Sequence, residues 1–169
     1  VHTCVALLGS RKCNDAAKIR LYNTLIVPIT LYGCEAWTMS GKHENKLLVF
    51  EMAALRRMLG VSRRDKIRNV DIRERLGVKE TLVQKVYQRQ HTWLGHVWRM
   101  NNERIAKFAL EGKVEGKRRV GKPKISWLPT ALKRCGLNLG EAIETANNRS
   151  DWKRLRQHAG AYVPPIRQK

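Results

Sequence analysis

The sequence predicts an all-α protein, a bundle of about six to eight helices joined by basic connecting loops. Apolar side chains recur at helical spacing in several segments, as on one face of a helix. The clearest case is residues 81–100, whose apolar series is Leu82, Val86, Trp93, Val97 and Met100. No segment of useful length alternates apolar and polar residues as a half-buried strand does. We therefore expect helices throughout, with residues 81–100 as the central buried helix.

The first predicted helix covers residues 15–27 and continues past a proline. Pro28 removes a backbone donor and crowds the preceding turn, so we expect a kink there and a continuation through Tyr32. The apolar face of this helix consists of Ile19, Tyr22 and Ile26.

A linker bounded by glycines, residues 33–41, leads to the second amphipathic helix. Gly60 should end that helix, because glycine readily adopts the left-handed conformation of a C-cap. Its apolar stripe consists of Leu48, Met52, Leu55 and Leu59. We expect this stripe to form the core together with Val86, Trp93 and Val97.

The corner before the central helix has its own start and stop signals. Asn69 or Asp71 should cap a short helix that Gly77 ends. Thr81 and Gln84 fit a capping box at the start of the central helix.

Beyond residue 100 we expect shorter helices and one basic loop. Residues 103–112, 125–135 and 141–146 predict helices, with Pro129 near the first turn of its helix. Ser150 should cap a last helix. Glycines and a proline make residues 112–123 a loop.

The charge of the chain is strongly positive for its length. Among 169 residues, 34 are Lys or Arg and 14 are Asp or Glu, so the formal net charge is +20 and the isoelectric point is near 10.5. This imbalance favours a polyanionic partner, and RNA, DNA or an RNA–DNA hybrid is the first candidate. We expect no membrane partner, because no segment reaches the roughly 18 apolar residues of a spanning helix.

Cationic side chains gather in three places, which we predict to contact nucleic-acid phosphates without reading sequence. The first set, relieved only by Asp65, is Arg56, Arg57, Arg63, Arg64, Lys66 and Arg68. The second set, on the central helix, is Lys85, Arg89 and Arg99. The third set, in the glycine-rich loop, is Lys117, Arg118, Arg119, Lys122 and Lys124. For the loop, a solvated segment or a nuclear-import signal is the alternative interpretation.

The spacing of the Cys and His residues does not favour metal binding, and we identify no catalytic motif in the sequence. The four cysteines are scattered and lack the spacing of a zinc site, so we expect reduced thiols in an intracellular protein of the nucleus and cytoplasm. His91 and His96 lie about 140° apart around a helix and cannot clamp one metal ion. We therefore expect no metal site and no catalytic residue in this chain.

Six stretches of the sequence form an ordered series over about residues 11–155. They are LYNTLIVPITLYGCEAWTM, FEMAALRRMLGV, RNVDIRERLGV, RQHTWLGHVWRM, GKRRVGKPKISWL and NNRSDWKRL. The series resembles the C-terminal part of reverse transcriptases from LINE-like, non-LTR retrotransposons. The family leads us to expect an acidic residue where this chain has Pro129.

The resemblance implies a thumb region, which grips template and primer downstream of the polymerase palm. We divide the chain into a thumb-like helical subdomain (1–60), a corner like a helix-turn-helix with the central helix (61–101), and a basic helical segment with a loose tail (102–169). In the family, an Asp-Asp box in the palm holds two magnesium ions together with another Asp. No Asp-Asp pair occurs here. We expect the parent polymerase to bind Mg²⁺, and this chain to bind no cofactor and to be inactive alone.

The palm domain of the parent polypeptide is then a second expected partner. Two alternatives belong to other classes of protein. One is a free-standing DNA-binding module that reads bases through residues 72–100. The other is a Mg²⁺-dependent nuclease, which chelator-sensitive cleavage would reveal.

Overall fold

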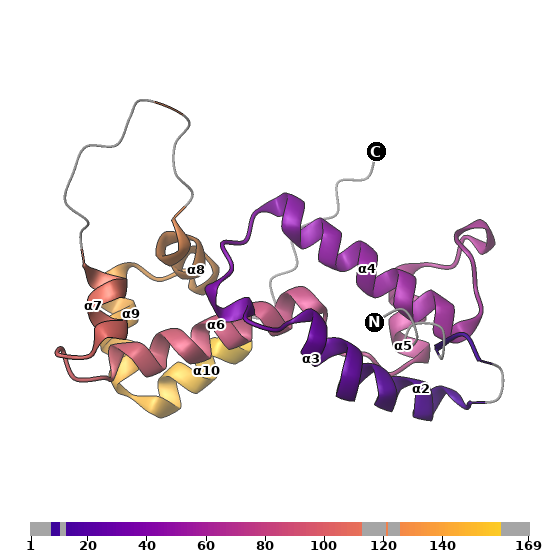
Figure 1. Cartoon of the computed structure of the whole chain (residues 1–169), viewed down its shortest axis with the longest axis horizontal. Coiled ribbons are helices and arrows are strands. Elements are labelled where there is room, and N and C mark those ends of the chain that lie inside the picture. Colours follow the sequence, from indigo (N-terminus) through magenta and orange to yellow (C-terminus); the bar gives the residue numbers. More distant parts are fainter. Residues whose placement is uncertain (1–7, 11–12, 113–120, 122–125, 160–169) are drawn as a thin grey trace. The chain divides into compact units, whose positions relative to one another are not determined.

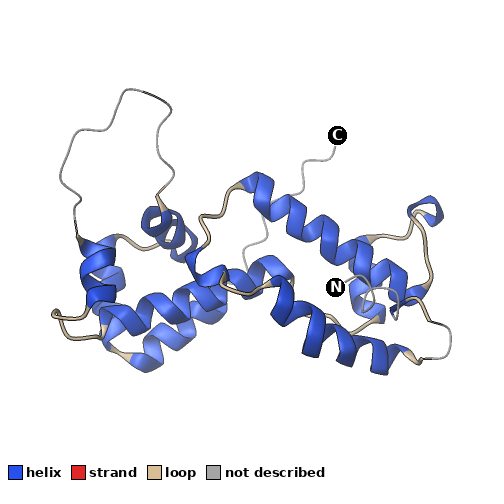
Figure 2. Cartoon of the chain, viewed as in Figure 1, coloured by secondary structure: helices blue, strands red, loops and turns tan. Residues whose placement is uncertain are grey.

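The computed structural model describes residues 8–10, 13–112, 121 and 126–159. Every regular element within these ranges is helical (Figure 2). Because α2, η1 and α3 form one continuous helix, the described residues contain eight helices besides two short 3-10 turns. The predicted all-α class and the predicted number of helices are confirmed.

The chain divides into two compact units, which we describe separately (Figure 1). Unit 1 comprises Val1–Gly33 and Ser40–Lys85, and unit 2 comprises Cys34–Met39 and Val86–Lys169. The boundary falls inside α6 (Leu82–Trp98). The division into three segments stays a prediction.

In unit 1, one long helix passes through a proline. Its parts are α2 (Asp15–Leu21), the π-helical turn η1 (Tyr22–Ile26) and α3 (Val27–Thr30). The backbone N–H of Val27 reaches the carbonyl of Tyr22, five residues back. This wide turn directly precedes Pro28 and leaves room for its ring. The predicted continuation past Pro28 is confirmed, but the helix ends at Thr30 and does not reach Tyr32.

The second helix, α4 (Gly41–Leu59), ends as predicted at Gly60. Gly60 has a φ of 67°, and its N–H donates to the carbonyl of Arg57 at 3.3 Å. The Nζ of Lys18 donates to the carbonyl of Met58 at 2.7 Å, so a cation from α2 also satisfies the C-terminal end of α4.

A buried carboxylate joins three helices of unit 1. Glu51 on α4 is only 1% exposed. It accepts a hydrogen bond from Arg73 of α5 (Asn69–Arg75) at 2.8 Å, and another from the backbone N–H of Leu82 at 3.1 Å. The second bond satisfies a free donor in the first turn of α6, where the helix dipole also favours a negative charge.

The corner between α5 and α6 matches the prediction in two respects and contradicts it in one. Gly77 ends α5 with a φ of 64°, and Thr81 and Gln84 form the predicted capping box at 2.7 and 3.2 Å. The expectation that Asn69 or Asp71 caps α5 is wrong. The N-cap residue is Arg68, without a side-chain bond, because Asn69 instead accepts a hydrogen bond from Arg56.

The described part of unit 2 contains the rest of α6, four further helices and a 3-10 turn. These elements are η2 (Cys34–Ala36), α7 (Ile105–Glu111), α8 (Trp127–Cys135), α9 (Leu139–Asn147) and α10 (Arg149–Ala159). The prediction that Ser150 caps α10 is wrong, because Ser150 lies inside the helix. The side-chain oxygen of Asn148 accepts the N–H of Ser150 at 3.0 Å and caps the helix in its place.

The core of unit 2 lies where α6 meets α8, α9 and α10. The rings of Trp98 and Trp152 meet edge to face at 5.6 Å, and Trp152 Nε1 donates to the carbonyl of His91 at 2.8 Å. The buried residues of this cluster are Leu94, Trp98, Ala131, Leu132, Ala142, Ala146 and Trp152.

Of the seven residues predicted to form one core, five are buried, and they are divided between the two units. Trp93 and Leu59 are the exceptions. Trp93 is 36% exposed, and the neighbouring Leu94 is fully buried instead. The buried face of α6 passes through Gln90 and His91, two polar side chains that an apolar count skips. Leu59 is the other exception, since it is only half-buried.

Candidate nucleic-acid interface

The first predicted cation set runs from the last turn of α4 to the N-cap of α5 in unit 1. Between these helices, the 3-10 turn η3 (Arg63–Asp65) carries two of its cations, Arg63 and Arg64. We call the exposed members of this set the basic turn: Arg57, Arg63, Arg64, Lys66 and Arg68. Figure 1 shows the connection projecting away from α5. Its cations are therefore open to solvent and to a ligand.

The one carboxylate of the basic turn is engaged by the backbone. Asp65 accepts the N–H of Ser62 at 2.6 Å, and Ser62 in turn accepts the N–H of Arg64 at 3.1 Å. This capping box fixes the turn and engages Oδ2 of Asp65 with the backbone. Lys66 closes the turn in the left-handed region, with a φ of 52°.

Arg56 belongs to the predicted set but has a different environment. Its guanidinium is half-buried and donates to the Asn69 side chain at 2.6 Å and to the Ile67 carbonyl at 3.4 Å. These bonds connect the segment that follows the basic turn to α4. Arg56 thus holds the basic turn in place.

The cations predicted on the central helix are all half-buried and bonded within the chain. The Nζ of Lys85 lies 3.5 Å from the Asn23 side-chain oxygen. Arg99 donates to the carbonyl of Ala146 at 2.7 Å. Arg89 interacts with the thiol of Cys34. Burial raises the pKa of that thiol, and the positive charge and hydrogen bond of Arg89 oppose the rise. The third predicted set, in the glycine-rich loop, lies outside the described residues.

Unit 2 contains a groove that the sequence did not predict. The α6–α10 groove has a volume of about 370 Å³, and none of its lining residues is acidic. Figure 1 shows the two helices side by side. The lining residues are Thr92, His96, Arg99, Arg149, Trp152, Lys153 and Arg156.

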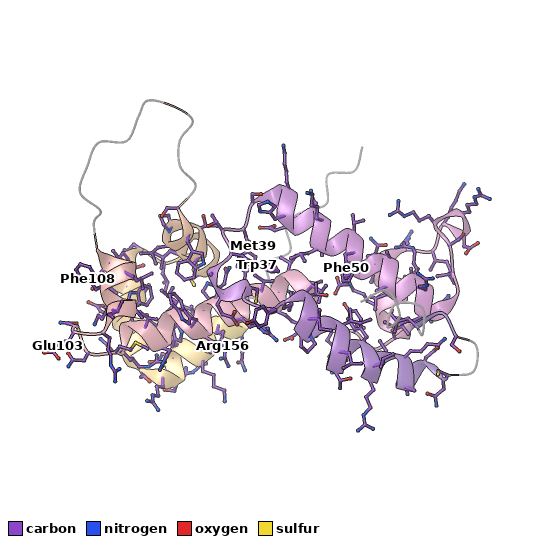
Figure 3. All side chains as sticks on the ribbon, in the orientation of Figure 1. Trp37, Met39, Phe50, Glu103, Phe108 and Arg156 are labelled. Carbon is purple, nitrogen blue, oxygen red and sulfur yellow. The ribbon has the colours of Figure 1, made fainter. Side chains whose placement is uncertain are left out.

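Polar side chains line the groove in two facing rows, and three of its four cations lie on α10. On α6, Thr92, His96 and Arg99 are spaced four and three residues apart, so they share one helix face. On α10, Arg149, Lys153 and Arg156 repeat that spacing. The helices run antiparallel, because Arg156, labelled in Figure 3, donates to Thr92 at 2.8 Å, while Arg99 bonds to Ala146 just before α10.

A glycine permits the close approach of the two helices. A Cβ at Gly95 would lie 2.1 Å from Nε1 of Trp152, which is only 4% exposed and cannot move aside freely. Gly95 and Trp152 therefore set the spacing between α6 and α10. The position of the two rows of lining side chains depends on this contact.

The electrostatics of the groove favour an anion. Burial lowers the pKa of the Arg99 guanidinium, and the positive charge of Arg149 lowers it further. The nearest carboxylate along α10, Asp151, lies about 200° around the helix from Arg149. It pairs with Asn148 at 2.6 Å and with Arg154 at 3.3 Å.

Sequence reasoning named Arg99 but missed the rest of the groove. The missed cations are Arg149, Lys153 and Arg156, all on α10. Their spacing was a usable signal, since three cations at i, i+4 and i+7 make a charged stripe along one helix. What the sequence does not reveal is that this stripe faces Thr92, His96 and Arg99 of α6.

Metal-ligating side chains do not cluster in the part of the chain that the structure describes. No group there unites three or more of His, Cys, Asp and Glu. His91 is fully buried, its Nε2 lies 3.1 Å from the Ala131 carbonyl, and burial lowers its pKa. Among the described helices, none is long and apolar enough to span a membrane.

Comparison with known proteins gives one informative similarity. The chain is 26% identical over 138 residues to a transposon-derived, uncharacterized protein of Caenorhabditis elegans. The match covers 76% of this chain and 49% of that relative, so the chain spans about half the relative's length. No protein-family model matches the chain. No solved structure matches it either.

Proposed function

We propose that this chain is a nucleic-acid-binding segment of a transposon-encoded reverse transcriptase and holds its ligand through backbone phosphates. The observation that carries the proposal is the basic turn, where five exposed cations surround one carboxylate that the backbone engages. A surface of this kind attracts a polyanion through charge and needs no base contacts.

Two further observations support this assignment. The net charge of +20 favours nucleic acid over other partners, and the similarity to a transposon-derived protein agrees with an origin in a mobile element. The ordered motifs that resemble non-LTR retrotransposon enzymes narrow the element to one encoding a reverse transcriptase. RNA, DNA or their hybrid is then the ligand, and the palm of the parent polypeptide is the neighbouring partner.

The palm would supply polymerase chemistry and its Mg²⁺ ions, because this sequence lacks the Asp-Asp box. We therefore assign binding, and no catalytic step, to this chain. Primer extension by the purified chain with template, nucleotides and Mg²⁺ should stay at background. Chelator-sensitive cleavage of nucleic acid would favour the nuclease alternative.

The geometry disfavours base reading by the central helix. A recognition helix needs an exposed face to enter the major groove. In residues 81–90, which include the start of α6, every side chain is buried or half-buried. The first half of α6, which a recognition helix would present to the base edges, therefore offers no exposed side chain, and exposed residues occur only from Thr92 onward.

A salt series tests the proposal. If the basic turn contacts phosphates, replacing Arg57, Arg63 and Arg64 together by Gln should reduce the slope of log affinity against log salt by about 2–3. Two duplexes of unrelated sequence should show the same reduction. Filter binding of wild type and triple variant measures both. An unchanged slope would remove the basic turn from the interface, and a loss confined to one duplex would favour a base-reading module.

A further inference from the structure

We propose that the α6–α10 groove is a second phosphate site, which holds consecutive phosphates of one nucleic-acid strand along α10. This inference rests on the proposed function, and it adds a site in unit 2 to the basic turn of unit 1. The groove residues Arg149 and Lys153 are its proposed contacts.

The cations of the groove divide into two fixed and two available ones. Thr92 donates its hydroxyl to the carbonyl of Gln88 at 2.6 Å and accepts a hydrogen bond from Arg156, so both partners are held in place. Arg99 is fixed in the same way by the carbonyl of Ala146. Each arginine has five N–H donors, so these single bonds leave donors free for a ligand.

Arg149 and Lys153 are the available cations. Both are exposed, and within the described residues neither side chain makes a hydrogen bond or an ion pair. Because Arg99 and Arg149 repel each other, an anion between the two helices would reduce that repulsion. The groove therefore gains from an anionic ligand that the chain itself does not supply.

The arrangement of the cations fits a polymer of phosphates better than a single anion. Seven residues of α-helix rise about 10 Å, so Arg149, Lys153 and Arg156 form a row of that length. A strand carries one phosphate at every nucleotide, so a row of this length can contact more than one phosphate of the same strand. The volume of about 370 Å³ exceeds what one phosphate fills and leaves room for the adjoining sugars.

The decisive experiment compares two variants of equal charge. Arg149→Gln/Lys153→Gln removes both available cations of the groove. Arg20→Gln/Arg154→Gln removes two exposed cations outside it, and Arg154 lies on the opposite face of α10. Two single variants of α10, Lys153→Gln and Arg154→Gln, repeat this comparison on one helix. They replace the double variants if either of those fails to fold.

Filter binding uses a single strand of about 20 nucleotides over a salt series. The groove variant should lower the salt slope by about 1.4, which is a roughly 25-fold weaker affinity near 0.1 M salt. The control variant should change affinity less than about threefold. Equal slopes for the two variants, with wild-type binding intact, would overturn the groove and leave the proposed function standing. A wild-type chain that binds no strand would overturn the proposed function itself.

The source of the phosphate is tested on the wild-type chain. The indole N–H signal of Trp152, which lines the groove, should shift in NMR spectra on adding a short oligonucleotide. It should not shift with a methylphosphonate strand, which lacks the charges. Saturation by inorganic phosphate at lower concentration than by the oligonucleotide would instead indicate a free-phosphate site. Equal displacement of the strand by polyglutamate would indicate an acidic protein partner. Either result would overturn the strand site.

Discussion

The basic turn of unit 1 and the α6–α10 groove of unit 2 gather cations by different means. The turn draws its cations from one short stretch, residues 57–68, and local bonds shape it. The groove draws its cations from two helices far apart in the sequence, and their packing shapes it. One surface is encoded locally and the other by the tertiary fold.

This difference predicts how each surface responds to change. Substitutions in the basic turn should alter binding and leave stability nearly unchanged, because its cations are exposed. Substitutions beneath the groove should alter stability first and binding as a consequence, because Gly95 and Trp152 belong to the core contact that positions the cations.

The largest expected effect is on the floor of the groove. Trp152→Ala should lower the free energy of unfolding by about 3–5 kcal/mol, since it removes a buried indole and its hydrogen bond to the His91 carbonyl. Trp93→Ala is the matched control. It removes a partly exposed indole with one edge contact to Trp127 and should cost about 1–2 kcal/mol. Urea unfolding followed by circular dichroism measures both losses. Equal losses would contradict the assignment of Trp152, and not Trp93, to the core.

The next effect tests the spacing of α6 and α10. Gly95→Ala should cost about 1–3 kcal/mol, because the new methyl group would overlap Trp152. It should also weaken the contribution of the groove to nucleic-acid binding. Gly41→Ala is the control, since an added Cβ there meets nothing within 4 Å. Thermal melts of the two proteins should differ clearly. A Gly95→Ala protein as stable as the control would show that the helices separate without cost.

A third comparison lies within the first predicted cation set. Arg56→Gln should cost about 1–2 kcal/mol, because it breaks the half-buried bonds to Asn69 and Ile67. Arg57→Gln should change stability by less than about 0.5 kcal/mol and lower the salt slope of binding by about 1. Denaturation and filter binding on the same two proteins separate support from contact. Loss of salt slope in both variants at equal stability would return Arg56 to the set of free cations.

The start and stop signals of the helices could be predicted from the sequence because they are local. The Thr81 and Gln84 box and the left-handed Gly60 and Gly77 each need only a few neighbouring residues. The basic turn could be predicted for the same reason. Asn69 escaped prediction because its partner, Arg56, comes from the preceding helix.

The groove could not be predicted because it depends on packing between distant segments. Residue spacing alone predicts a cationic stripe on α10. It does not predict which face of α6 packs opposite this stripe. From the sequence, Gly95 is only a residue of low helix propensity. The structure shows that Trp152 occupies the space a Cβ would need. Likewise, Gln90 and His91 read as polar surface, and their burial moved the core from Trp93 to Leu94.

The smallest expected effect concerns the pH dependence of stability in unit 2. The Nε2 of His91 lies 3.1 Å from the Ala131 carbonyl, and a carbonyl only accepts, so this nitrogen carries the proton. The Nδ1 is buried and has no partner within the described residues. Protonation would place a charge and an unpaired N–H in the core, which agrees with the lowered pKa of His91.

Below the usual histidine pKa of about 6.5, the unfolded chain therefore binds a proton that the folded chain resists. Stability should fall as pH falls from about 6.5 toward the lower pKa of folded His91. His91→Gln, which can still donate to the Ala131 carbonyl, should flatten this part of the profile. His96→Gln, which changes an exposed residue of the groove, should leave it unchanged. Urea unfolding between about pH 7.5 and 5 compares the three proteins, and parallel profiles for wild type and His91→Gln would show that other groups cause the acid loss.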